Sequence, residues 1–467
     1  MKRTVWHDAV AILLVILAFL GGPKIYARIK YSATSSTCTV DLNGGSDYTT
    51  VHDALNEPTC RQIDIAPGTY FENLIIQRDV AIHGVSQDKV ILDGSLGSPV
   101  LNILDNTRVD ATGLTIQRGT NGILNRGTLV ITDSTITRNS VHDIPGAGIL
   151  NIHKATLVNV TLSGNTTGLE GGGIYGDINT ETVVIRSTLR DNVAGRNGDG
   201  MYIQGDNGHI FSYLTVSDST IYNSGTAILG STEYSVIHIT NSTLTHNNIG
   251  LAPSYGGQFT VSNTIIADNN EDCTGSIISA GHNIEDTNTC GLQKSSDHPN
   301  TNPQLGPMQN NGGTTETRAL LPGSPAIDAG SNTDCPNIDQ RGQLRPIDGD
   351  ADLRSVCDIG AYEYNPFGAL SLSIANLSTD SVMVGAQGFT LTINGQNFVN
   401  GAILQWNGNN QPTMFVNSTQ LQALISASDV AKEGTVIVRI SNPDGLISNG
   451  IEFTIRRLRI YLPLTQR

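Results

Sequence analysis

Residues 122–140 read GILNRGTLVITDSTITRNS, and residues 148–166 repeat the same shape as GILNIHKATLVNVTLSGNT. Each copy opens with Gly and Ile, continues with alternating apolar residues, and ends in Thr-Ile or Thr-Leu before a polar turn. The pattern recurs through residues 122–270, and its first apolar positions lie 26, 25, 27 and 27 residues apart at Ile123, Ile149, Ile174, Met201 and Ile228. A fixed period of this length indicates one stacked supersecondary unit.

The repeated units are predicted to be strands, because their apolar residues alternate and Thr, Val and Ile dominate. Two short strands with turns describe one coil of a parallel β-helix, in which neighbouring coils share a column of inward Ile, Leu and Val. An antiparallel sandwich also has short strands, but it does not require the same residue at the same place in every unit. We therefore expect an all-β fold with a parallel β-helix over this part of the chain.

A small polar residue stands four positions after each Thr of the pattern. Asn tolerates the left-handed region, and stacked amides can hydrogen-bond from one coil to the next. A polar column is therefore predicted along one corner of the coils, at Asn139, Asn165, Asn192, Ser224, Asn247 and Asp268.

The length of 467 residues indicates more than one domain. Gly is abundant at 50 residues, while charged residues make up 15% and aromatic residues 5% of the chain, which is typical of a turn-rich β protein. The net charge of −15 argues against nucleic acid and anionic lipid as partners, and it permits cation binding.

Residues 1–33 are predicted to be a signal peptide or an N-terminal membrane anchor. Lys2 and Arg3 precede an apolar run over residues 9–20, which suits a signal sequence and is short for a membrane span. We therefore expect an exported protein, extracellular or on the cell surface. Contact with a membrane would come only through this segment, if it stays uncleaved.

The six cysteines agree with an oxidising compartment, because they are even in number and show no spacing typical of zinc ligands. Pairing sequence neighbours would give three local loops, although six cysteines allow fifteen connectivities. The suspected pairs are Cys38 with Cys60, Cys273 with Cys290, and Cys335 with Cys357.

Residues 38–94 are predicted to form the first coils, with a helical turn at residues 51–55 covering the open end of the core. The stretch Gly68-Thr69-Tyr70-Phe71-Glu72 and the strands after it resemble the N-terminal part of pectin-lyase-like right-handed β-helix proteins. Enzymes and non-enzymes share this motif, so the resemblance implies a fold and leaves the activity open.

Residues 271–365 lose the regular period but contain three recognisable words, SPAIDAG at 324–330, DQRG at 339–342 and CDIGAYE at 357–363. They resemble the C-terminal module of the choice-of-anchor Q family of bacterial surface β-helix proteins. The resemblance implies export and one β-helix domain over residues 38–365 with this module as its cap. It brings no shared catalytic residues.

Residues 370–456 change to a compact set of strands. The motifs Gly395-Gln396-Asn397-Phe398, Trp406-Asn407-Gly408 and Ser441-Asn442-Pro443-Asp444-Gly445 resemble an IPT/TIG domain, which implies an immunoglobulin-like sandwich. The basic and apolar tail at residues 457–467 is too short to span a bilayer, so we interpret it as a final strand or an attachment segment.

A ligand-binding strip is predicted from the strand phase. If Ile174 and Met201 point inward, Tyr175 and Tyr202 point outward on adjacent coils, and Asp177 and Gln204 share that face. Such a strip could stack on a sugar ring and hydrogen-bond its hydroxyls. The other interpretation is that this face packs beneath a loop.

Asp348, Asp350 and Asp352 alternate like the first half of a calcium loop, with Gly349 between the first two. Hard oxygen ligands at this spacing suit Ca²⁺, although the distal Glu of an EF-hand is missing. Ca²⁺ is the one cofactor that the sequence suggests, and a solvated acidic turn is the other interpretation.

We therefore expect an exported, non-catalytic β-helix protein that presents a long face for adhesion or for binding a polysaccharide or a surface protein. No residue is assigned a catalytic role. The alternative is a polysaccharide lyase or glycoside hydrolase of the pectin-lyase-like fold that uses the face carrying Tyr175, Asp177 and Gln204.

Overall fold

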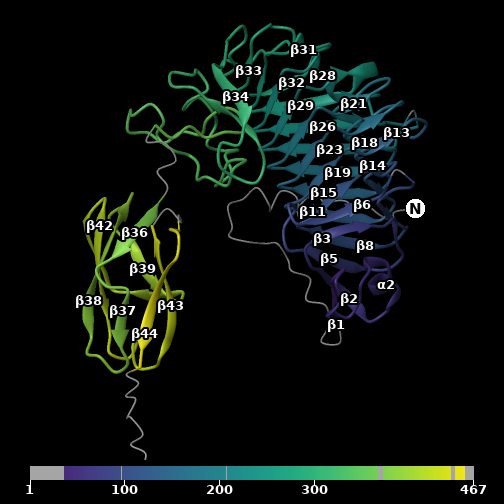
Figure 1. Ribbon diagram of the computed structural model, residues 1–467. Coiled ribbons are helices and arrows are strands. Elements are labelled where there is room, and N and C mark those ends of the chain that lie inside the picture. The colour runs from purple at the N-terminus through teal and green to yellow at the C-terminus, as the bar shows by residue number, and fades with distance from the viewer. Residues whose placement is uncertain (1–35, 96, 207, 367–371, 443–446, 458–467) are drawn as a thin grey trace, which may run out of the picture. The chain divides into compact units, whose positions relative to one another are not determined.

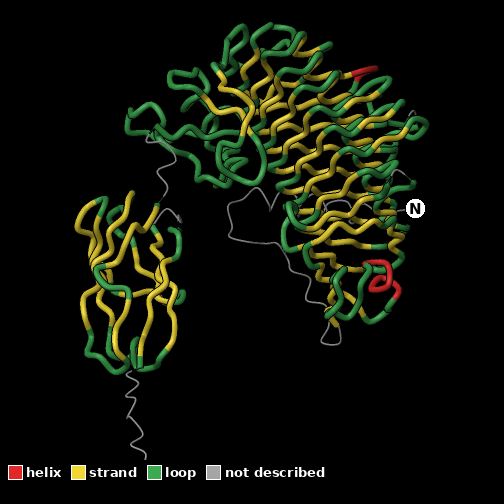
Figure 2. Tube along the Cα trace, viewed as in Figure 1, coloured by secondary structure: helices red, strands yellow, loops and turns green. Residues whose placement is uncertain are grey.

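The computed structural model describes residues 36–95, 97–206, 208–366, 372–442 and 447–457. The chain divides into two compact units, Met1–Pro366 and Phe367–Arg467, and both consist of strands joined by loops, with almost no helix in the described residues (Figure 2). The predicted export segment at 1–33 lies outside the described residues, as do residues 458–467 of the tail. No helix in the described ranges is long and apolar enough to cross a membrane.

The first unit is a parallel β-helix made of three sheets (Figure 1). Sheet 1 has eleven strands, sheet 2 has nine and sheet 3 has ten, and each coil runs from sheet 1 to sheet 3 to sheet 2. Sheet 1 contains β1 (Ser36–Val40), β2 (Cys60–Ile65), β5 (Val80–Gly84), β8 (Arg108–Thr112), β11 (Thr128–Thr132), β15 (Lys154–Val158), β19 (Glu181–Ile185), β23 (Ser212–Ser217), β26 (Ser235–Thr240), β29 (Gln258–Ser262) and β32 (Ile278–Gly281).

Sheets 2 and 3 follow the same coil order. Sheet 2 contains β4 (Leu74–Ile76), β7 (Leu101–Ile103), β10 (Ile123–Asn125), β14 (Ile149–Asn151), β18 (Ile174–Gly176), β22 (Met201–Ile203), β25 (Thr226–Gly230), β28 (Ile249–Pro253) and β31 (Glu271–Cys273). Sheet 3 contains β3 (Gly68–Phe71), β6 (Val90–Asp93), β9 (Thr115–Gln117), β12 (Thr135–Thr137), β16 (Thr161–Ser163), β20 (Thr188–Arg190), β24 (Thr220–Tyr222), β27 (Thr243–Thr245), β30 (Ile265–Ala267) and β33 (Ile284–Glu285). A small parallel sheet joins β13 (Ser140–Val141), β17 (Thr166–Thr167) and β21 (Val193–Ala194).

The repeat positions stack as the sequence predicts. Each residue of the set Ile123, Ile149, Ile174, Met201 and Ile228 pairs in register with the next along sheet 2. All five side chains are fully buried. The shared aliphatic column is therefore confirmed, and it leaves the alternate residues of each strand on the outer face.

The amide column at the turns from sheet 3 to sheet 2 is also present. Asn139 Nδ2 donates to Asn165 Oδ1 at 2.9 Å, and Asn165 Nδ2 donates to Asn192 Oδ1 at 3.0 Å. The prediction was wrong at Asp268, because Thr243 pairs with Ile265 and the last coil is displaced by one residue. Asn269 holds the column position there, and it accepts from Asn247 Nδ2 at 3.0 Å.

The N-terminal end of the core is covered by α2 (Val51–Asn56), as expected, with Thr50 as its N-cap. Glu72, the last residue of the Gly68–Glu72 motif, accepts the amides of Val51 and His52 at 2.9 and 2.7 Å. A carboxylate is stabilising at a helix N-terminus because free N–H groups and the helix dipole meet there. The motif therefore has a structural role, because it holds the helix that covers the N-terminal end of the β-helix core.

Three disulfides form between sequence neighbours, and they use all six cysteines. The pairs are Cys38–Cys60, Cys273–Cys290 and Cys335–Cys357. Of the fifteen possible connectivities, the structure has the local one that the sequence suggested. Cys38–Cys60 joins β1 to β2 in the first coils, Cys273–Cys290 lies in the last coils, and Cys335–Cys357 lies in the segment that follows them.

Residues 305–364, here called the docking segment, fold back over the outer face of sheet 3. The segment begins with an antiparallel pair, β34 (Leu305–Gln309) and β35 (Thr317–Leu320). Thr188 Oγ1 in β20 donates to the carbonyl of Glu316 at 2.6 Å, and Arg318 Nη1 donates to Thr245 Oγ1 in β27 at 2.7 Å. The later coils of sheet 3 are therefore covered by the chain itself.

The second unit is a β-sandwich of a four-stranded and a five-stranded sheet. Its core contains Leu391, Ile393, Leu404, Trp406 and Phe453, and it holds no disulfide. The four-stranded sheet contains β36 (Ser373–Leu377), β38 (Phe389–Gln396), β42 (Gln420–Ile425) and β41 (Thr413–Asn417). The five-stranded sheet contains β37 (Ser381–Met383), β44 (Ile451–Arg456), β43 (Gly434–Ser441), β39 (Ile403–Trp406) and β40 (Asn409–Gln411).

Candidate functional site

Two tyrosines on the outer face of sheet 2 form the centre of the candidate site. Tyr175 in β18 pairs in register with Tyr202 in β22. Their rings are stacked, with centroids 5.4 Å apart and an interplanar angle of 3°. Both side chains are half-buried, and they point outward because Ile174 and Met201 point into the core. We call this pair the tyrosine column.

Asp177 and Gln204 occupy the next outward positions, where sheet 2 turns into sheet 1. Tyr175 Oη donates to Gln204 Oε1 at 3.5 Å, which joins the two coils. Asp177 Oδ1 accepts the amide of Ile178 at 2.8 Å, so the carboxylate is held by its own turn. All four residues of the predicted strip therefore lie on one face, as the strand phase suggested.

A pocket of about 430 Å³ lies beside Tyr202 at the same corner. We call it the corner pocket, and it is lined by Tyr202, Gln204, Ser231, Thr232, Glu233, Tyr234 and Tyr255. Tyr175 is not part of the lining. The pocket is built by the turns that follow β22, β25 and β28, the last of which includes η1 (Ser254–Gly256).

Tyr255 has an unusual conformation in the wall of the corner pocket. Its backbone is left-handed, with φ 45° and ψ 37°, and its side chain is 92% exposed. A non-glycine residue in this region is strained by roughly 1–3 kcal/mol. Such strain with no burial in return is a reason to look for a functional role of the ring.

More aromatic side chains surround the corner pocket. Tyr234 Oη hydrogen-bonds His209 Nδ1 at 2.7 Å, and the Phe211 ring packs edge-on against Tyr234 at 5.3 Å. Sequence reasoning missed these residues because they lie in irregular turns. Their signal was an aromatic residue in three successive turns of a chain that has few of them.

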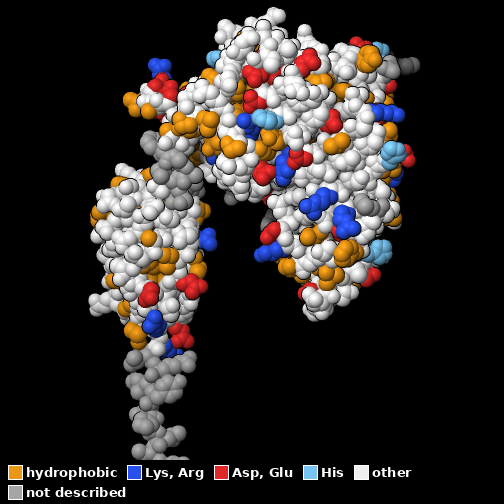
Figure 3. All heavy atoms as spheres, turned by 45° about the horizontal axis from the view of Figure 1, so that its top comes forward, with side chains coloured by type: hydrophobic (Ala, Val, Ile, Leu, Met, Phe, Trp, Pro, Cys, Tyr) orange, Lys and Arg blue, Asp and Glu red, His pale blue; other side chains and the backbone are white. Residues whose placement is uncertain are grey.

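The surroundings of the tyrosine column and the corner pocket are acidic. Burial raises the pKa of Tyr175, and the negative charge of Asp177 adds to the rise. Burial also raises the pKa of Tyr202, a hydrogen bond with Ser231 opposes the rise, and Glu170 adds to it. Of the described residues that line the pocket, none is Lys or Arg. Elsewhere, Figure 3 shows charged side chains scattered among a majority of uncharged ones on the face in view.

The predicted calcium loop brings together a different set of carboxylates. Asp328, Asp348 and Asp350 each offer an oxygen within 4.8 Å of the others, so these three could hold a cation. Asp352 is outside the group, and its Oδ1 accepts the amide of Arg354 at 2.8 Å. Within the described part of the chain, Asp348 Oδ1 is buried without a hydrogen-bond partner. Sequence reasoning missed Asp328, although it lies in the SPAIDAG word.

Asp328 organises this loop through the backbone. Its Oδ2 accepts the amides of Gly349 and Asp350, both at 2.8 Å, and its Oδ1 accepts the amide of Val356 at 3.2 Å. Burial raises the pKa of Asp328, which these hydrogen bonds oppose. The acidic cluster therefore has a structural explanation even without a metal ion.

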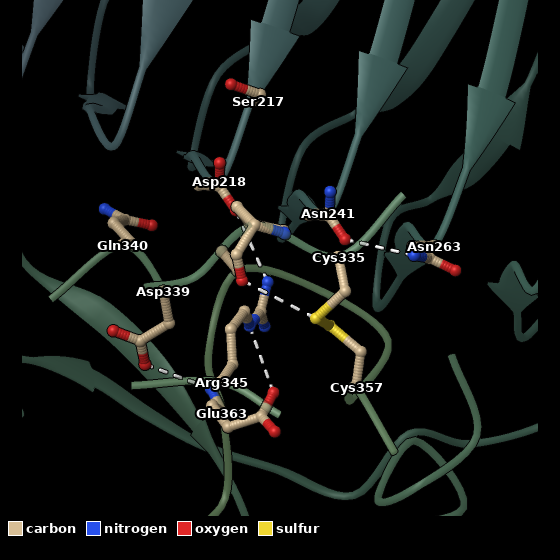
Figure 4. Close-up of polar contacts among 12 residues, drawn as sticks. Ser217, Asp218, Asn241, Asn263, Cys335, Asp339, Gln340, Arg345, Cys357 and Glu363 are labelled. Carbon is tan, nitrogen blue, oxygen red and sulfur yellow. Dashed lines mark hydrogen bonds and ion pairs between the residues drawn. A yellow bond between two sulfur atoms is a disulfide. The ribbon is translucent and has the colours of Figure 1, made fainter. Parts of the chain in front are cut away.

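A buried polar network joins the docking segment to the β-helix (Figure 4). Arg345 Nε donates to Glu363 Oε2 at 3.0 Å, and Arg345 Nη1 lies 3.3 Å from Asp218 Oδ1 at the turn between β23 and β24. Arg345 Nη2 also donates to the carbonyl of Gly360 at 3.0 Å. The three charged side chains are almost fully buried, so each depends on the others for its partners.

The DQRG word supplies the second half of this network. Gln340 Oε1 accepts from Thr220 Oγ1 at 2.6 Å, and its Nε2 donates to Thr188 Oγ1 at 2.9 Å. Asp339 forms an ion pair with Arg341 at 2.6 Å, and the Arg341 guanidinium lies 3.5 Å from the centre of the Tyr362 ring. These motif residues are therefore explained by docking onto sheet 3.

The carboxyl groups of the network titrate unusually. Burial raises the pKa of Asp218 to about 7, and the positive charge of Arg345 limits the rise. Burial likewise raises the pKa of Asp358 and of Glu363, whose charges also interact with each other. A raised pKa often marks a functional group, but these carboxyl groups are buried where the docking segment packs against the β-helix.

The first unit is thus a parallel β-helix with an outward aromatic corner, and the second is an immunoglobulin-like sandwich. This architecture is consistent with a surface or binding protein. Residues 373–455 match the family model of the IPT/TIG domain. Among curated proteins none matches the chain. The match does not extend to residues 271–365, so the resemblance to the choice-of-anchor Q module stays a prediction.

Proposed function

We propose that the protein is exported and binds glycans at the tyrosine column without cleaving them, while the IPT/TIG domain serves as a spacer or a protein-contact module. The observation that carries the proposal is the stacking of Tyr175 on Tyr202 with Gln204 beside them. The face of a stacked ring that its partner leaves uncovered offers apolar contact to a sugar ring, and the adjacent amide offers hydrogen bonds.

The local environment of Asp177 favours binding over catalysis. Cleavage of a glycosidic bond generally uses two carboxyl groups on opposite sides of the bond. The Asp177 carboxylate accepts a hydrogen bond from the adjacent amide of Ile178. Of the described residues, the corner pocket is lined by one carboxyl group, that of Glu233, and by no Lys or Arg that could act as the base of an elimination.

Export is supported by the three disulfides, because such bonds persist in oxidising compartments and are rare in the cytosol. The acidic overall charge fits a polysaccharide or a surface protein as partner better than nucleic acid. The apolar run at residues 9–20 would direct the export.

The test is a glycan array with the purified exported protein and with the double variant Tyr175→Ala/Tyr202→Ala. We expect wild-type binding to several related glycans and a loss of at least tenfold in the variant. Tyr222→Ala is the matched control, because Tyr222 is an outward tyrosine on β24 in sheet 3 and stacks on His246 in a similar way.

A second measurement separates binding from catalysis. The glycans that bind on the array are incubated in solution with the protein. Unsaturated products would report elimination, and new reducing ends would report hydrolysis. Turnover that is abolished by Asp177→Ala would replace the proposal with the lyase or hydrolase alternative. Absence of binding to any glycan would refute the proposal itself.

A further inference from the structure

The outward residues that continue the tyrosine column become progressively smaller along sheet 2, and none of them is aromatic. Tyr202 pairs in register with Leu229 of β25, and Leu229 pairs with Ala252 of β28. Leu229 and Ala252 are both buried. One face of the Tyr202 ring contacts Tyr175, and the corner pocket lies on the side of β25 and β28. The stack of rings therefore stops where the pocket begins.

We infer that the corner pocket binds one uncharged sugar ring, stacked on the free side of Tyr202 as the third ring of the tyrosine column. This inference rests on the proposed glycan binding and names the class of glycan. The volume of the corner pocket, about 430 Å³, falls in the range of small-ligand sites. Tyr234 and Tyr255 supply further aromatic wall, and Gln204, Ser231 and Thr232 supply amide and hydroxyl groups.

The charges around the pocket select against uronic acids. Glu233 belongs to the lining, and Asp177 and Glu170 act on the neighbouring tyrosine column. A sugar carboxylate in the pocket would lose water and lie beside Glu233, which is unfavourable at short distance. The cation Arg196 is paired with Glu170 at 3.2 Å and is not part of the lining. Proteins that bind carboxylates use Arg or Lys for this purpose, and the lining contains neither.

The experiment compares sugars that differ only in charge. Neutral hexasaccharides of glucose, mannose and xylose are titrated against the full-length exported protein by calorimetry. The glucose and mannose chains are also tested after oxidation of their C6 alcohols to carboxylates. We expect a neutral chain to bind and its oxidised counterpart to bind at least tenfold more weakly. Added salt and Glu233→Gln should both narrow the difference, because each weakens the repulsion.

Two tyrosine variants test where the sugar ring binds. Tyr255→Ala removes a wall of the corner pocket and should weaken binding of the neutral chain severalfold. Tyr213→Ala is the matched control, because Tyr213 is an exposed neighbour outside the lining. Neither side chain contributes to the core, so both variants should fold.

The possible outcomes separate the inference from the function on which it rests. Equal binding of oxidised and neutral chains, or an unchanged affinity in Tyr255→Ala while Tyr175→Ala abolishes binding, would overturn the corner pocket and leave the proposed function standing. Failure of every chain to bind would overturn both. Binding of an unglycosylated surface protein that depends on Tyr202 and Tyr255 would assign the pocket to a protein ligand instead.

Discussion

The buried ion network gives the sharpest prediction about stability. Replacing Arg345 with Met keeps most of the side-chain volume and removes the cation that faces Glu363 at 3.0 Å and Asp218 at 3.3 Å. Breaking a buried pair by removing one partner costs roughly 3–5 kcal/mol, because the remaining charge has no compensation. We therefore expect the docking segment to open about a hundredfold to a few thousandfold more often, since each 1.4 kcal/mol is about a factor of ten.

Hydrogen exchange at the amides of Gln340 and Glu363 measures this opening, because both amides are hydrogen-bonded inside the network. Tryptophan fluorescence would miss it, since the described part of the chain has its tryptophan, Trp406, in the second unit. Lys154→Met is the matched control. It breaks a pair with Glu181 at 2.9 Å whose side chains are 46% and 34% exposed, and exposed pairs contribute about 0–1 kcal/mol.

The pH dependence tests the cause of the effect. The positive charge of Arg345 lowers the pKa of both Asp218 and Glu363, so its loss moves both values further upward. At about pH 5 the folded variant can keep these carboxyl groups protonated and neutral. At about pH 8 the unfolded chain releases their protons, so the folded variant either buries two charged carboxylates or keeps protons that the unfolded chain has lost, and both cost stability. The cost should therefore grow with pH. An exchange rate that rises less than tenfold at about pH 8, or rises more at about pH 5, would refute the reasoning.

Four further predictions concern other parts of the molecule. In the wild type, the raised pKa of Asp218 means that docking loses stability as pH rises from about 4 through about 7, so exchange in the docking segment, corrected for intrinsic rates, should be faster at about pH 8 than at about pH 6. Tyr255→Gly should leave the free energy of unfolding unchanged or raise it by up to about 1 kcal/mol relative to Tyr255→Ala, because Gly tolerates the left-handed backbone. A Gly variant less stable than the Ala variant, in urea unfolding followed by circular dichroism, would contradict this. If Asp348 ligates Ca²⁺, excess Ca²⁺ should raise the Tm of metal-stripped protein and Asp348→Asn should remove the rise; an unchanged wild-type Tm would reject the calcium hypothesis. Asn165→Ala should cost about 1–3 kcal/mol because it leaves buried amide groups of the column unpaired, whereas Asn270→Ala at an exposed pair should cost less than about 0.5 kcal/mol in the same urea titration.

The periodic part of the fold could be predicted from the sequence because each coil repeats the same inward residues. Ile123 and Met201 are identifiable from spacing alone, and their neighbours in register follow. The one-residue displacement at Thr264-Ile265 could not be predicted. A Thr-Ile pair satisfies the pattern in either phase. In the structure Ile265 pairs with Thr243, and Thr264 lies at the preceding turn, where its Oγ1 accepts the amide of Ser242 at 3.4 Å.

That hydrogen bond belongs to a second polar column that sequence reasoning missed. At the turns from sheet 1 to sheet 3, the amides of Val160, Ser187 and Ser219 donate to the hydroxyls of Ser187, Ser219 and Ser242 at 3.0, 3.0 and 3.3 Å. Serine is common in all kinds of turns, so its presence there does not predict a column. Only the stacking of the coils brings the hydroxyls into line.

The candidate site, like the fold, has one part that could be predicted from the sequence and one part that could not. The tyrosine column follows from strand phase, since alternate residues of a strand point to opposite faces. The corner pocket does not, because Tyr234 and Tyr255 lie in turns whose course depends on the turns above and below. Asp328 was missed for a related reason. It is twenty residues before Asp348 in the chain, and the docking segment brings the two together.

The corner that carries the tyrosine column and the corner pocket is made by four successive coils, those of β18, β22, β25 and β28. In a solenoid, stability is close to a sum of the units and of the contacts between nearest neighbours. Nothing at the corner therefore requires a particular number of coils before it. These four coils form a self-contained unit, and a shorter or longer solenoid that received all four would carry the tyrosine column and the corner pocket with them.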